Sequence, residues 1–167
     1  MIYYITGGER SGKSSHAQKL AEGLSDNPYY LATSRIWDKD FEKRVKRHKN
    51  DRDERWTTIE EEKEISKVIP KNSVVVIDCV TLWLTNLYFD SENNVEKSLE
   101  LATIEIENLA KLNSQIIIIS NEIGMGVHAQ THVARKFTEL QGWVNQRIAN
   151  KADKAIFMVS GLPLTLK

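Results

Sequence analysis

The stretch "GGERSGKS", from Gly7 to Ser14, has the spacing of a phosphate-binding loop, with Gly7, Gly12, Lys13 and Ser14 at the defining positions. Glycines let backbone N–H groups curl around phosphate oxygens, and the N-terminus of the following helix adds a favourable dipole. Lys13 is expected to reach the β- and γ-phosphates, and Ser14 to ligate Mg²⁺. The alternative is an ordinary glycine turn before a helix. The position of the loop between a predicted strand and a predicted helix favours nucleotide binding.

Two acidic residues stand where predicted strands end. Asp78 closes the run "VVVID", and Glu122 in "SNEIGMG" follows the next predicted central strand. Ligands of open α/β sheets bind at the carboxyl ends of the strands, so both side chains are expected to face the nucleotide. There Asp78 can hold Mg²⁺ or its water shell. Each residue has a simpler interpretation as a helix N-cap or a rim charge.

His48 lies in a dense basic run, "RVKRHKNDRDERW", from Arg44 to Trp56. From Phe41 to Arg55 the chain has seven basic and four acidic residues, and this local excess indicates a bound anion. A neutral imidazole is a good nucleophile toward phosphorus, and adjacent cations favour its neutral form. Helical spacing offers an alternative: if Phe41 to Arg52 is helical, His48 falls on the apolar face and is a satisfied core histidine.

Three polar residues, Thr33, Ser34 and Arg35, follow the predicted strand "YYLAT". Their hydroxyl groups and positive charge can contact a nucleotide at the same edge of the sheet. A plain helix cap is almost as good an explanation.

These residues require a scaffold of alternating strands and helices to bring them together. Apolar, β-branched runs and shorter candidates predict strands at Ile2 to Thr6, Tyr29 to Thr33, Trp56 to Glu60, Ser73 to Cys79, Gln115 to Ser120 and Ala155 to Ser160. Helices are predicted from Val95 to Leu112 and from about His132 to Asn150. Alternation of strand and helix implies parallel pairing, so the sequence predicts a three-layer α/β domain.

Length and composition limit the classes of protein. The 167 residues suit one domain spanning the whole chain, and 23 basic side chains balance 23 acidic ones, so no global field recruits nucleic acid or anionic lipid. Cys79 is the only cysteine, which excludes an intramolecular disulfide and fits a reducing compartment. No signal peptide and no bilayer-length apolar run is present, so we expect a cytoplasmic protein without a membrane anchor.

Taken in order along the chain, these segments resemble the bifunctional adenosylcobinamide kinase/adenosylcobinamide-phosphate guanylyltransferase family. The resemblance covers essentially the whole chain. It is carried by "TGGERSGKSSHA", "YLATSRI", the histidine segment from Arg44 to Glu60, "DCVTLWLTNL", "SNEIGMG", "VNQRIANKAD" and "VSGLPLTLK". After "SNEIGMG" this family usually continues with valine, proline, glutamate and asparagine, whereas this chain has "VHAQTH" from Val127 to His132.

The resemblance implies two reactions and a RecA-like P-loop domain that forms homotrimers. ATP or GTP first phosphorylates the aminopropanol hydroxyl of adenosylcobinamide. GTP then guanylylates a histidine, by match His48, with release of pyrophosphate, and the GMP passes to the new phosphate to give adenosylcobinamide-GDP. The nucleotide contacts implied by the match are Gly7, Gly8, Glu9, Arg10, Ser11, Gly12, Lys13, Ser14, Ser15, Thr33, Ser34, Arg35, Lys49, Asn50, Asp51, Arg52, Glu60 and Asp78, and Mg²⁺ is expected at Ser14 and Asp78.

Two other functions are compatible with a P-loop. One is a single-reaction kinase of a small alcohol, in which His48 belongs to the core. The other is a RecA-like ATPase on nucleic acid that uses the basic run as a phosphate track. The run has aromatic residues only at its ends, Phe41 and Trp56, whereas stacking platforms need them interleaved, so nucleic acid is not an expected partner.

Overall fold

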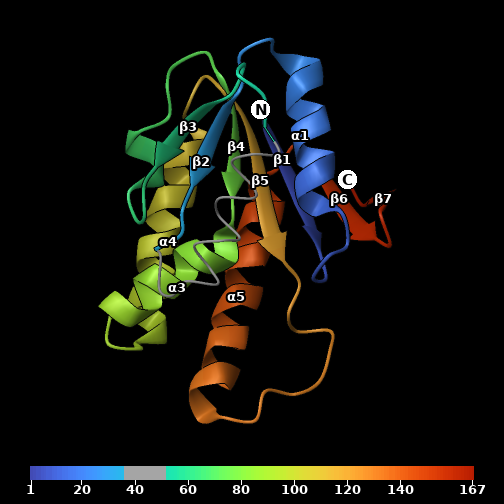
Figure 1. Ribbon diagram of the computed structural model, residues 1–167. Coiled ribbons are helices and arrows are strands. Elements are labelled where there is room, and N and C mark those ends of the chain that lie inside the picture. The colour runs from blue at the N-terminus through green and yellow to red at the C-terminus, as the bar shows by residue number, and fades with distance from the viewer. Residues whose placement is uncertain (36–51) are drawn as a thin grey trace.

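The computed structural model describes residues 1–35 and 52–167 (Figure 1). The elements along the described chain are β1 (Ile2–Gly7), α1 (Lys13–Leu24), β2 (Tyr29–Ala32), β3 (Thr57–Glu60), the 3-10 helix η1 (Ile65–Lys67), β4 (Val74–Asp78), α3 (Val80–Asp90), α4 (Val95–Ala110), β5 (Gln115–Asn121), α5 (His132–Lys151), β6 (Lys154–Val159) and β7 (Leu162–Thr165).

The strands of the described ranges form one sheet in the order β3-β2-β4-β5-β1-β6-β7. All neighbours pair in parallel except β6 and β7. The carboxyl ends of the parallel strands therefore meet at one edge. There Gly7 pairs with Asn121, while Ala32 has Glu60 on one side and Asp78 on the other. The sheet topology thus gathers residues from distant parts of the sequence at this edge.

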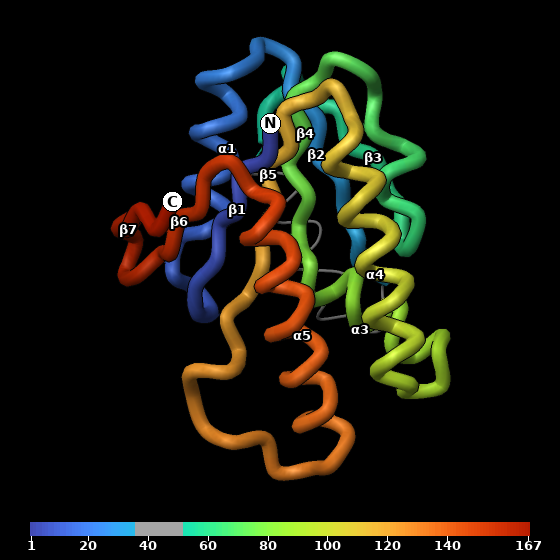
Figure 2. The backbone as a smooth tube through the Cα atoms, turned by 180° about the vertical axis from the view of Figure 1, so that it is seen from behind, coloured from blue at the N-terminus to red at the C-terminus, as the bar shows by residue number. Residues whose placement is uncertain are grey.

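Successive side chains of a strand point to opposite faces, and both faces of the sheet are covered. Tyr3 and Ile5 pack with Ala17 and Ala21 of α1. Ile2 and Tyr4 belong to the larger core on the other face, formed with α3, α4 and α5. Figure 2 shows α4 and α5 in front of the sheet and α1 behind it. This arrangement confirms the predicted three-layer α/β architecture with a mostly parallel sheet.

The predicted elements agree with the described structure to within one or two residues at most ends. Three were not predicted: η1, α3 and the edge strand β7. The segment "FDSENN", from Phe89 to Asn94, has the composition of a surface loop, but in the structure Phe89 and Asp90 end α3, and Asn94 caps α4 by accepting a hydrogen bond from Lys97 N. Of the conditional helix from Phe41, Arg52 lies outside any helix and the remainder lies outside the described residues. Within the described ranges, no helix combines the length and apolar character needed to cross a membrane.

Candidate nucleotide-binding site

The loop between β1 and α1 is tightly packed against the turn between β6 and β7. Gly7 has a φ of 153°, and a Cβ there would lie 2.5 Å from the carbonyl oxygen of Met158. Gly12, the N-cap of α1, has a φ of 95°, and its Cβ would lie 3.1 Å from Cα of Gly161. Gly161 N also donates to Ser11 O at 2.9 Å. These positions accept glycine because both backbone conformation and space exclude a side chain.

Gly7→Ala is expected to lower the free energy of unfolding by about 1–3 kcal/mol, because the new methyl group displaces a backbone carbonyl. Chemical denaturation measures the change. Gly8→Ala is the matched control, since a Cβ at Gly8 has no neighbour within 4 Å and should leave stability nearly unchanged. Equal stability of the two variants would contradict the packing described for this loop.

Lys13 begins α1 and is only 7% exposed. Its Nζ donates to Gly8 O at 2.6 Å and lies 3.5 Å from Ser11 Oγ. The ammonium group is therefore held inside the curve of the loop, where the β- and γ-phosphates of a nucleotide are expected. Burying this charge in the protein costs free energy, and a bound polyphosphate offsets that cost.

Asp78 ends β4 beside the first turn of α1, and two hydroxyl groups donate to the same oxygen of its carboxylate. Ser14 Oγ lies 3.2 Å from Asp78 Oδ2, and Tyr30 Oη lies 2.7 Å from it. Burial, followed by the charge of Asp78, raises the pKa of Tyr30 well above its ordinary value, so the phenol keeps its proton and remains a donor. The two residues predicted to bind Mg²⁺, Ser14 and Asp78, thus lie together.

Their chemistry fits Mg²⁺, which prefers oxygen ligands and commonly takes one carboxylate together with waters and substrate phosphates. Among the described residues there is no group of three or more His, Cys, Asp or Glu side chains that could hold a metal by itself. A site completed by nucleotide phosphates is the kind that these two side chains can build.

Arg52 approaches the same place from the chain that precedes β3. Its guanidinium carbon lies 3.6 Å from the ring centroid of Tyr30, a cation–π contact. Tyr30 also meets Trp56 edge to face, with centroids 6.4 Å apart. Sequence reasoning missed Tyr30. The alternation of β2 places it on one face, but only the pairing of β2 with β4 shows that this is the face of Asp78.

The side chains of Thr33 and Arg35 each form hydrogen bonds to distant segments of the chain. Thr33 is fully buried and its hydroxyl donates to Cys79 O at 2.9 Å, joining the end of β2 to β4.

Arg35 donates to both carboxylate oxygens of Asp90, at 2.8 and 2.7 Å, and to Glu62. Hydrogen bonds to Asp90 and then Glu62 raise the pKa of Arg35, and Arg35 together with Lys63 lowers the pKa of Asp90. Nucleotide contacts by Thr33, Ser34 and Arg35 remain predictions.

Glu122 lies at the carboxyl edge of the sheet, as expected, and Glu60 lies at the carboxyl end of β3. Glu122 N donates to Gly7 O at 3.0 Å, so this residue is adjacent to the start of the phosphate-binding loop. Its carboxylate accepts from Gly124 N at 2.7 Å and shapes the turn that follows β5. Glu60 is exposed at the end of β3. His48, Lys49, Asn50 and Asp51 lie outside the described residues.

Cys79 is buried directly after Asp78, and burial raises the pKa of its thiol to about 12. The folded pKa lies above the ordinary value of 9.0, so this group stabilises the fold below about pH 9. The contribution is lost as the pH rises from there toward 12, because the unfolded thiol ionises first.

We therefore expect Cys79 to resist thiol reagents in the native protein at about pH 8 and to react fully after denaturation. Counting thiols with a chromogenic disulfide before and after addition of guanidinium measures this. Rapid labelling of the native protein would contradict the burial of Cys79.

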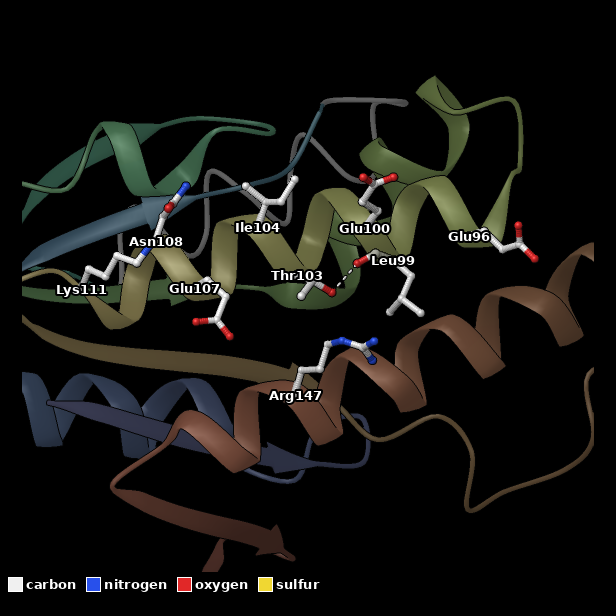
Figure 3. Close-up of a pocket in the computed structure, with 9 residues that line it drawn as sticks. All are labelled: Glu96, Leu99, Glu100, Thr103, Ile104, Glu107, Asn108, Lys111 and Arg147. Carbon is white, nitrogen blue, oxygen red and sulfur yellow. Dashed lines mark hydrogen bonds between the residues drawn. The ribbon is translucent and has the colours of Figure 1, made fainter.

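A hollow of about 580 Å³ lies elsewhere, along α4 and the facing side of α5 (Figure 3). Arg147 of α5 points toward the side of α4 that carries Glu107. No residue predicted for the nucleotide site lines it. The residues with nucleotide chemistry instead gather at the carboxyl edge of the sheet.

The fold and this edge define a class: an α/β protein with a P-loop, in which Lys13, Ser14 and Asp78 lie close together at the carboxyl edge of the sheet. A family model described as "Cobinamide kinase / cobinamide phosphate guanyltransferase" matches residues 3–166, and the chain belongs to this family.

Relatives match over essentially their full lengths. The bifunctional adenosylcobalamin biosynthesis protein CobU of Escherichia coli (strain K12) is 34% identical and covers 100% of both chains. The bifunctional adenosylcobalamin biosynthesis protein CobP of Pseudomonas aeruginosa is 34% identical over 98% of this chain and 95% of its own. Among solved structures, an ATPase domain has a TM-score of 0.44 at 15% identity, covering 93% of this chain and 68% of that one.

Proposed function

We propose that this protein phosphorylates the aminopropanol hydroxyl of adenosylcobinamide and then converts the product to adenosylcobinamide-GDP. The observation that carries the proposal is the buried Lys13 beside the Ser14–Asp78 pair, in a chain that matches the bifunctional family from residue 3 to residue 166. ATP or GTP serves as phosphoryl donor, and GTP supplies the GMP.

In the first reaction the substrate hydroxyl oxygen attacks the γ-phosphorus and loses its proton to solvent, the bond from that phosphorus to the β–γ bridging oxygen breaks, and a nucleoside diphosphate leaves. Little covalent chemistry is required of the protein, so its contribution is positioning and charge stabilisation. Lys13 neutralises the β- and γ-phosphates, and backbone N–H groups from Gly8 to Ser15 surround their oxygens. Ser14 and Asp78 would hold Mg²⁺, which would supply Lewis-acid stabilisation of the same oxygens.

In the second reaction a nitrogen of His48 attacks the α-phosphorus of GTP, and pyrophosphate leaves. A phosphate oxygen of adenosylcobinamide phosphate then attacks the same phosphorus and displaces the imidazole, which restores His48. Splitting one displacement into two is the usual gain of nucleophilic catalysis. Lys49 to Arg52 and Glu60 contact the nucleotide during this reaction, together with Thr33 to Arg35.

The protein acts as a homotrimer in the cytoplasm. An apolar stripe at the end of the sheet supports association: Leu162, Leu164 and Leu166 alternate along and just beyond β7 and are 72%, 56% and 61% exposed. Contiguous exposed apolar side chains of this kind mark contact surfaces between proteins.

Product analysis tests the proposal. Purified protein is incubated with adenosylcobinamide, Mg²⁺ and either ATP alone or ATP with GTP, and the corrinoids are separated and weighed by mass spectrometry. We expect adenosylcobinamide phosphate with ATP alone and adenosylcobinamide-GDP when GTP is added. Accumulation of the phosphate in both reactions would support a single-reaction kinase instead.

A further inference from the structure

Tyr30 contacts two residues of the candidate site, Asp78 and Arg52. Its hydroxyl donates to Asp78 on β4, and its ring lies under the guanidinium of Arg52, which belongs to the basic run from Arg44 to Trp56 that also contains His48. We infer that Tyr30 is a positioning residue that orients Asp78 toward Mg²⁺ and supports Arg52 against the nucleotide phosphates. This inference rests on the proposed function and deepens it.

The hydrogen bond from Tyr30 to Asp78 supports this role most directly. Ser14 and Tyr30 converge on the same carboxylate oxygen, Oδ2, at 3.2 and 2.7 Å. If Ser14 turns its oxygen toward Mg²⁺, its hydrogen bond to Asp78 is weakened, and the shorter bond from Tyr30 then fixes the carboxylate. Partners that orient metal ligands in this way matter, because their loss typically weakens metal affinity or activity by about 10–100-fold.

The contact between Tyr30 and Arg52 connects the proposed Mg²⁺ ligand Asp78 to the basic run. Arg52 Nη1 is buried, and within the described residues no hydrogen-bond acceptor satisfies it. A buried cationic donor of this kind suits a phosphate oxygen, which accepts strong charge-assisted hydrogen bonds. The Tyr30 ring, 3.6 Å from the guanidinium carbon, holds Arg52 next to Asp78 before that phosphate binds.

Packing alone explains the ring of Tyr30 but not its hydroxyl. Tyr30 is 5% exposed and its ring meets Trp56, so an aromatic residue suits the position. A phenylalanine preserves those contacts as well as the cation–π contact with Arg52. Tyr30→Phe therefore removes only the hydrogen bond to Asp78, whereas Tyr30→Leu removes the aromatic platform as well.

The neighbouring tyrosine provides a matched control. Tyr29 lies on the same strand but on the opposite face of the sheet, half-buried against the other core. Tyr29→Phe deletes the same atom from the same strand without touching Asp78.

Calorimetric titration with GDP, in the presence and absence of Mg²⁺, tests the inference without requiring turnover. In the wild-type protein and in Tyr29→Phe, Mg²⁺ should strengthen GDP binding. In Tyr30→Phe that Mg²⁺ effect should fall by about tenfold or more, while GDP affinity without Mg²⁺ stays within about twofold of wild type. Tyr30→Leu should also weaken Mg²⁺-free GDP binding, by about threefold, because Arg52 loses its platform.

The Mg²⁺-free affinity shows that Tyr30→Phe remains folded, so a general loss of structure cannot produce the expected pattern. An unchanged Mg²⁺ effect in Tyr30→Phe, or an equal loss in Tyr29→Phe, would overturn the inference. Production of adenosylcobinamide-GDP by the wild-type protein is measured in parallel, so that a failure of the proposed function is distinguished from a failure of the role of Tyr30.

Discussion

His48→Ala is expected to abolish formation of adenosylcobinamide-GDP and to leave phosphorylation of adenosylcobinamide largely intact. Guanylyl transfer through a histidine has no route without the nucleophile. Phosphoryl transfer goes directly from the nucleotide to the substrate hydroxyl and depends on the loop, Mg²⁺ and Asp78. The two half-reactions are measured separately, together with the melting temperature of the variant.

His128→Ala is the control for this substitution, since His128 is an exposed histidine in the loop after β5. It should retain both activities. A core role for His48 predicts another outcome, because truncation of a packed side chain costs stability and lowers both activities together. Loss of both activities with a lowered melting temperature, or retention of both, would contradict the assignment of His48 as the nucleophile.

Lys13→Ala is expected to reduce the kinase reaction by about a hundredfold or more at saturating nucleotide, the scale seen when one preorganised donor is removed. The structure supplies the reason: the ammonium group is buried inside the loop, 2.6 Å from Gly8 O, so it is already in place before the nucleotide binds. Initial rates of adenosylcobinamide phosphorylation measure the loss.

Lys19→Ala is the matched control, because Lys19 is an exposed lysine of the same helix. It should behave like the wild-type protein. Near-normal turnover of Lys13→Ala would show that the loop from Gly7 to Ser14 does not hold the transferred phosphate.

The parts of the site that could be predicted from the sequence are those encoded locally. The phosphate-binding loop is a contiguous motif, and its strand and helix have clear patterns on either side. The edge position of Asp78 follows from a short apolar run that ends in a carboxylate. The loop assignment needed only the motif, and the Asp78 assignment needed in addition the rule that parallel strands bring their carboxyl ends together.

Other features depend on contacts between distant residues or on atypical patterns. Tyr30 and Asp78 are 48 positions apart, so their hydrogen bond follows only from the pairing of β2 with β4. Arg35 is held by Glu62 and Asp90, which come from two separate parts of the chain. The helix α3 is buried on several sides and therefore lacks a clear apolar stripe in the sequence. Pro163 is atypical of a strand, so the sequence pattern at β7 indicates a loop.

The proposed mechanism requires His48 to carry GMP covalently between the two reactions. The most direct test is to incubate the protein with GTP labelled at the α-phosphate and, separately, at the γ-phosphate, and then to denature it and map the labelled peptide. We predict that only the α-label remains, on the peptide containing His48, and that this phosphoramidate is lost in acid and survives alkali. A retained γ-label, or an α-label on a peptide without His48, would contradict the account.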